Sequence, residues 1–72
     1  MRQIKANIAN INGIDFGIHN VNCIQWSRNG IYKIWVDNND CYDPTLAGLT
    51  MFTWDKERQL FVVGNLKATI ME

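Results

Sequence analysis

The chain has 72 residues, a formal net charge of zero and a hydrophobic content of 47%. This length allows a single domain, residues 1–72, and the hydrophobic content is too high for a disordered tail. Proteins that bind nucleic acid non-specifically are usually basic, so the zero net charge disfavours that function. No apolar run reaches the roughly 20 residues of a membrane span, so we expect no membrane insertion.

The first segment, residues 4–18, predicts a β-hairpin that turns at an Asn-Gly pair. A three-residue loop, 11–13, places Ala6 opposite Ile18 and gathers the apolar side chains on one face. His19 then belongs to the polar face. A two-residue loop would mix apolar and polar side chains on both faces, so the pattern favours the three-residue loop.

The second segment, residues 24–36, predicts another hairpin around a second Asn-Gly pair. A three-residue loop, 28–30, places Trp26 on the core face and turns Trp35 and Ile31 to the opposite face. With a two-residue loop the two tryptophans would share a face, and Trp35 would be an ordinary core residue. The functional prediction for this chain therefore depends on the length of one loop.

Residues 37–44 form a polar break whose final Asp-Pro pair favours one short helical turn near residues 44–48. Four oxygen-bearing side chains lie here, at Asp37, Asn39, Asp40 and Asp43. The spacing lacks the glycine and the glutamate of a calcium loop and has Tyr42 and Gly48 in their places. We expect a loop of Asx turns and no metal.

A third hairpin is predicted from strands at 49–54 and 59–63, with Phe52 opposite Phe61 and with apolar side chains on both faces. A Gly-Asn turn then leads to a last strand, 66–70. The chain is thus predicted to be all-β, a small antiparallel barrel or sandwich of six to seven short strands.

Neither a catalytic motif nor a cofactor motif stands out. His19 is the only histidine, and beside a turn we expect it to be solvated. Cys23 and Cys41 allow one disulfide at most, and residues 1–10 lack the apolar core of a signal peptide. We therefore expect a non-enzymatic, cytoplasmic protein with reduced cysteines and without a cofactor. A domain this short has a marginal core, which favours oligomerisation.

The segment I-D-F-G-I-H, residues 14–19, resembles the aromatic-glycine strand of cold-shock and other oligonucleotide-binding barrels. This resemblance implies an alternative function, a small barrel that binds single-stranded nucleic acid through Phe16, Trp35 and scattered basic residues. The segment departs from the pattern because it lacks the basic residue before the glycine and the second aromatic residue. Both departures weaken the expected stacking platform.

An outward-facing tryptophan favours a protein contact, because tryptophan is enriched among interface anchors. The predicted partner-binding residues are Trp35 as the anchor, Ile31 as its neighbour, Lys33 and Arg28 at the rim, and Tyr42. The alternatives are that another strand or the 37–44 loop covers Trp35. We expect a protein-binding module, favoured as a homodimer, that acts by surface occlusion or as an assembly subunit. An inhibitor encoded by a phage or mobile element is one such hypothesis.

Overall fold

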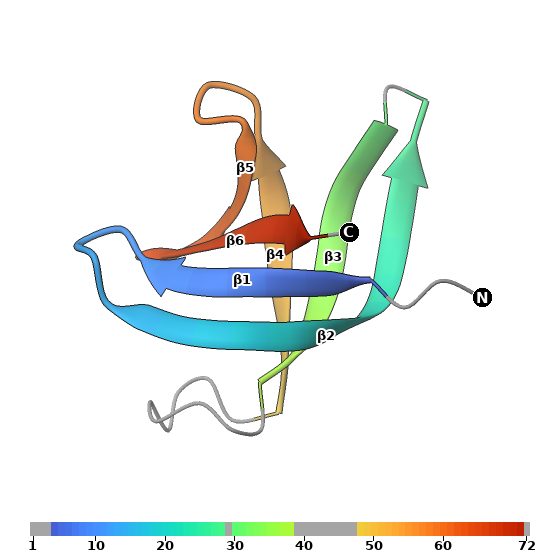
Figure 1. Cartoon of the computed structure of the whole chain (residues 1–72). Helices are drawn as coiled ribbons and strands as arrows, with labels where there is room; N and C mark the ends of the chain where they lie inside the picture. The colour runs from blue at the N-terminus through green and yellow to red at the C-terminus, as the bar shows by residue number, and fades with distance from the viewer. Residues whose placement is uncertain (1–3, 29, 39–47, 72) are drawn as a thin grey trace.

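The computed structural model describes residues 4–28, 30–38 and 48–71 as a closed antiparallel barrel (Figure 1). Its strands are β1 (Lys5–Asn10), β2 (Asp15–Ser27), β3 (Gly30–Asp37), β4 (Leu49–Asp55), β5 (Leu60–Val63) and β6 (Leu66–Met71). Each strand pairs with its neighbour in sequence, and β6 pairs with β1 to close the barrel. The all-β prediction is confirmed, and the architecture is a barrel. The expected helical turn near residues 44–48 lies largely outside the described residues.

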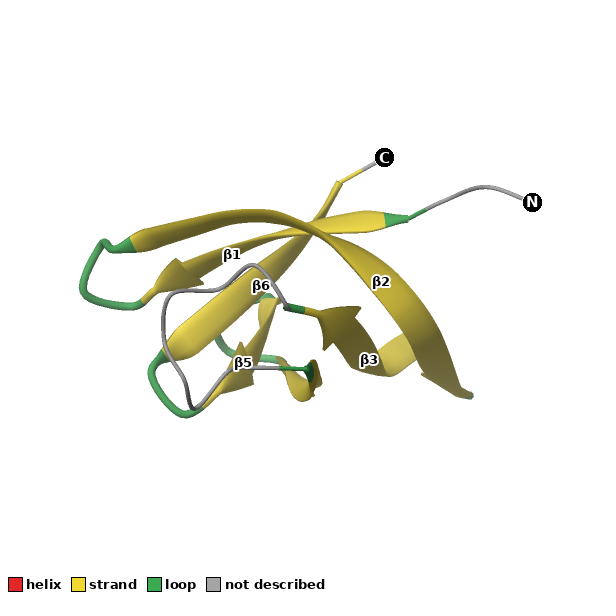
Figure 2. Cartoon of the chain, turned by 90° about the horizontal axis from the view of Figure 1, so that it is seen from below, coloured by secondary structure: helices red, strands yellow, loops and turns green. Residues whose placement is uncertain are grey.

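The barrel has six strands because two strands predicted as separate are one. The first half of β2, residues 15–20, lies beside β1, and its second half, residues 21–27, lies beside β3. The junction, residues 19–22, contains neither glycine nor proline, so nothing in it breaks the strand. Figure 2 shows the resulting bend of β2 from one side of the barrel to the other.

The first hairpin has the expected three-residue loop, in which Gly13 adopts a φ of 99° and Asn10 N–H donates to Ile14 C=O. Beyond the loop the register prediction is wrong, because a bulge at Phe16 and Gly17 inserts one extra residue, Phe16, into β2. Ala6 consequently lies opposite His19 and not opposite Ile18. A bulge inverts the faces that follow it.

The loop of the second hairpin is one residue shorter than predicted. Ser27 pairs with Gly30, and the Ser27 hydroxyl donates to Gly30 C=O at 3.0 Å, so two residues separate the strands. The extra residue lies instead within β3 at Tyr32, between the pairs Gln25–Lys33 and Trp26–Ile31. Ile24 still pairs with Ile34 as predicted.

The third hairpin is present, but its register differs from the predicted one. Trp54 pairs with Phe61, two positions away from the expected Gln59. Asp55 belongs to the strand, and its carboxylate accepts hydrogen bonds from the backbone N–H groups of Glu57 and Arg58. Because a strand repeats every two residues, this shift leaves the faces unchanged.

The core of the described chain is small. Eight apolar side chains are buried, namely Ala6, Ile8, Ile34, Val36, Phe52, Phe61, Leu66 and Ala68. At its margin the rings of Trp54 and Phe61 meet edge to face, with centroids 5.0 Å apart. The predicted Gly64-Asn65 turn is confirmed, with Val63 paired to Leu66.

We predict that Gly17→Ala lowers the free energy of unfolding by about 1–2 kcal/mol, the usual cost of left-handed backbone for a residue with a Cβ. The φ of Gly17 is 89°, and no atom lies within 4 Å of the added Cβ, so backbone strain is the whole effect. Urea denaturation measures it. Asn20→Ala, an exposed change in the same strand, is the control, and equal stability of the two variants would contradict this account of the bulge.

Candidate protein-binding surface

Trp35 lies on the outer face of the barrel, as the sequence predicts. Its neighbours along β3, Ile34 and Val36, are fully buried, and successive side chains of a strand point to opposite faces. Trp35 itself is half-buried, and it pairs with Cys23 on one side and with Met51 on the other.

These contacts place an apolar surface across three strands. We define the Trp35 patch as Cys23 of β2, Trp35 of β3, and Leu49 and Met51 of β4. Leu49 and Met51 are 60% and 39% exposed, and Cys23 is exposed with a free thiol. Within the described ranges no strand covers this face; the 37–44 loop that the sequence offered as a cover falls, from residue 39 onward, outside them.

Lys33 borders the patch, as expected for a rim residue. It lies two positions from Trp35 on the same face and pairs with Thr53 and Gln25. Its ammonium lies 5.5 Å from the centroid of the Tyr32 ring, within the range of a cation–π contact.

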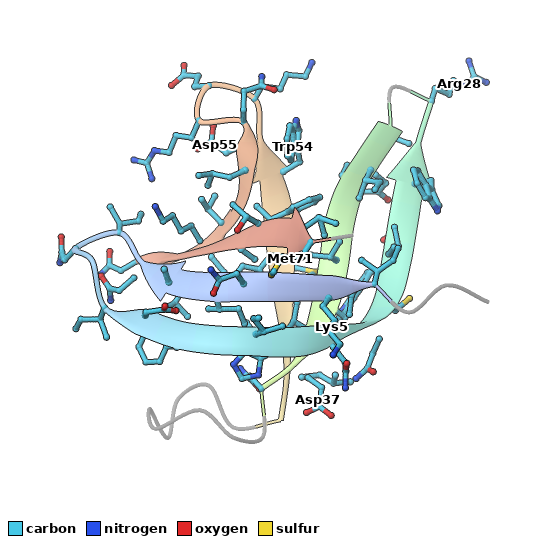
Figure 3. All side chains as sticks on the ribbon, viewed as in Figure 1. Lys5, Arg28, Asp37, Trp54, Asp55 and Met71 are labelled. Atoms are coloured by element: carbon cyan, nitrogen blue, oxygen red, sulfur yellow. The ribbon has the colours of Figure 1, made fainter. Side chains whose placement is uncertain are left out.

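The structure separates the other expected contact residues from the patch. Ile31 packs against the core, contrary to prediction, because the bulge at Tyr32 turns it inward. Arg28 is exposed at the tip of the β2–β3 hairpin, pointing away from the barrel (Figure 3). Tyr42 lies outside the described residues.

Trp26 is the exposed aromatic residue that sequence reasoning missed. It was predicted in the core, but 64% of its surface is exposed. Its place near the tip of a hairpin is the reason, because the strand ends there extend past the residues that fill the barrel. The Asn-Gly pair three residues later was the available sequence indication of that tip.

The residues with chemical potential lie apart from one another. His19 is not solvated as expected: it is only 7% exposed, and its Nε2 atom lies 3.0 Å from Phe16 C=O. Asp55 and Arg58 form an ion pair at 3.8 Å in an exposed turn. Over the residues that the structure describes, no group of three His, Cys, Asp or Glu side chains could hold a metal ion.

Hollows on the surface of the described residues include two that lie away from the Trp35 patch. One, of about 280 Å³, adjoins Trp54, Phe61 and Ile70 at the end of the barrel. The other, of about 360 Å³, lies over β1 and β6, where Asp15 and Lys67 contribute its charged groups. Neither of these two hollows includes a residue of the Trp35 patch.

No protein-family model, curated protein or solved structure matches this chain significantly. Its topology can be compared directly with the barrels that residues 14–19 resemble. Oligonucleotide-binding barrels have five strands in Greek-key order, whereas these six strands follow one another around the barrel. Among the described residues no helix is long and apolar enough to cross a membrane.

We predict that Cys23 reacts with a maleimide in the folded protein at a rate within about tenfold of that of an unstructured thiol, since it is exposed. A Cys41→Ser background restricts the reaction to Cys23, and mass spectrometry follows it. The same protein in urea supplies the reference rate. Protection of several hundredfold in the folded state would show that the patch is covered.

Proposed function

We propose that this protein is a non-enzymatic protein-binding module that uses the Trp35 patch to occupy a partner's surface, by occlusion or as an assembly subunit. The observation that carries the proposal is a half-buried tryptophan on the outer face, flanked by Met51 and Cys23 on neighbouring strands. A tryptophan supported in this way loses little side-chain freedom on binding. Such residues are common anchors of protein interfaces.

The composition of the patch supports a protein partner. Its centre is apolar, and Lys33 provides a charge at its border, the distribution usual for protein interfaces. Thr53 adjoins Lys33 on the same face and adds a hydroxyl group to the border. A small-molecule site would instead need a concave apolar pocket with convergent polar groups.

We also propose that the module works as a homodimer. The buried core includes two alanines among its eight apolar side chains, and it is small for a stable domain. Several large apolar side chains are exposed, and with a net charge of zero little repulsion opposes association. Self-association would bury part of this surface.

The matched test compares Trp35→Ala with Ile18→Ala, which truncates an outward-facing residue of β2 that is 55% exposed. The two variants and the unmodified protein each serve as bait. Any protein that the bait retains is then purified and titrated against each of the three forms by calorimetry. We predict that Trp35→Ala weakens binding at least about thirtyfold, the loss typical of an interface hot spot. Ile18→Ala should leave binding unchanged, and circular dichroism confirms that both variants fold.

The proposal is wrong if the unmodified protein retains no partner that binds it when both are purified. It is also wrong if truncation of Trp35 leaves the dissociation constant unchanged.

Single-stranded nucleic acid is the alternative ligand, supported by the exposed Trp26 two residues before Arg28. Stacking on an aromatic ring next to a cation is the usual mode of such binding. Our proposal predicts no gel shift with mixed-sequence oligonucleotides up to about 100 µM protein, near the limit of non-specific binding. A shift that weakens steeply with salt and disappears in Trp26→Ala would favour the alternative.

A further inference from the structure

Among the described residues, the second half of β2 has an open edge. Pairing between β1 and β2 ends with the pair of Lys5 and Asn20, and one further hydrogen bond joins Val21 N–H to Ile4 C=O. From Cys23 to Trp26, β2 pairs with β3 alone among the described strands. Figure 1 shows this end of the β2–β3 hairpin projecting beyond β1 and β6. We call Asn22–Trp26 the β2 edge.

The β2 edge lacks the usual protection of a strand edge. Natural edges carry charges, especially lysine, or proline, which oppose pairing with another chain. Residues 20–27 contain neither, and Cys23, Gln25 and Trp26 are exposed. β5, which has no charged residue, is paired on both sides, by β4 and β6. Within β2 itself the bulge at Asn22 is the protective feature. The extra residue of the second register shift, between Gln25 and Trp26, belongs to β3, so β2 has no inserted residue from Cys23 to Trp26.

We propose that the β2 edge pairs with the β2 edge of a second copy, antiparallel across a twofold axis at Gln25. This rests on the self-association proposed above and names its surface. An edge is its own complement in such a pairing, because each strand offers alternating N–H and C=O groups to the other. An uncharged edge meets no like charge when it faces a copy of itself.

The register follows from the faces and from the exposed apolar groups. A pairing centred on a residue keeps both outer faces on the same side of the joined sheet. Centred on Gln25, it sets the two Gln25 amides opposite each other on the outer face. It also sets Ile24 of each copy opposite Trp26 of the other, and so covers the exposed indole. Centred on Ile24, it would place Trp26 opposite the bulged Asn22 instead.

This dimer has a consequence for binding. Because the axis runs perpendicular to the joined sheet, the two Trp35 patches lie on the same side of it. Cys23 and Trp35 pair with each other one strand in from the edge, so the patches adjoin the new interface. The dimer would therefore present a bivalent surface, which suits a partner that is itself repeated or symmetric.

The test compares two variants, each of which places one negative charge beside Lys33, on the β2 side in one variant and on the β4 side in the other. Gln25→Glu and Thr53→Glu each set a carboxylate opposite this lysine, so both favour the folded monomer equally. Only Gln25→Glu also brings two carboxylates together across the twofold axis. Sedimentation should show a dimer dissociation constant at least about tenfold higher for Gln25→Glu, with most of the loss recovered in high salt. The dimer dissociation constant of Thr53→Glu should equal that of the unmodified protein.

Disulfide trapping tests the register independently. In a Cys23→Ser, Cys41→Ser background, Gln25→Cys should oxidise to a covalent dimer, because opposed Cα atoms of an antiparallel pair lie within disulfide range. Thr53→Cys should stay monomeric on a reducing-agent-free gel. Absence of the Gln25→Cys dimer overturns the proposed register.

The outcomes separate this inference from the function on which it rests. A dimer weakened by Trp35→Ala but not by Gln25→Glu overturns pairing at the β2 edge and leaves self-association standing. A protein that is monomeric at every concentration overturns both the edge pairing and the homodimer. Binding of a partner through the Trp35 patch would survive either result.

Discussion

The barrel depends on one strand that pairs with two different neighbours. β2 lies beside β1 along its first half and beside β3 along its second, so it joins the two sides of the sheet. A regular strand of 13 residues is too straight for this, and two irregularities in its pairing, at Gly17 and near Asn22, permit the bend. Closure through β1 and β6 then leaves the end of the β2–β3 hairpin outside the barrel.

The same bend decides which groups remain on the surface. After Gly17, His19 faces inward and Ile18 outward, because the bulge exchanges their faces. Past Asn22, β2 has left β1, and its backbone on that side has no described strand beside it. The core is correspondingly small, and the apolar side chains that it does not use form the Trp35 patch and the exposed hairpin end. Fold and binding surface thus have a common origin.

Some of this architecture could be predicted and some could not. The three hairpins were found from their turn residues and from the alternation of their strands. Phe52 and Phe61 were predicted to share a face, and both are buried in the core despite a register error of two residues, since such an error preserves the faces. The positions of Ile18, His19 and Ile31 were wrong, because a bulge moves a side chain to the other face. Trp26 was predicted in the core and is exposed because it lies near the tip of a hairpin that extends past the barrel. Trp35 was placed correctly, because the extra residue at Tyr32 offsets the shorter loop and restores the predicted register from Lys33 onward.

The sequence by itself determined an all-β chain of hairpins, because turn chemistry and strand alternation are local properties. It also determined that Trp35 and its flanking residues face opposite ways. Only the tertiary structure decided where the extra residues lie, since a bulge costs little locally and its place is selected by closure of the barrel. That selection joined two predicted strands into β2, exposed Trp26 and left the β2 edge open. No local pattern specifies these three features, because each depends on which strand lies beside β2.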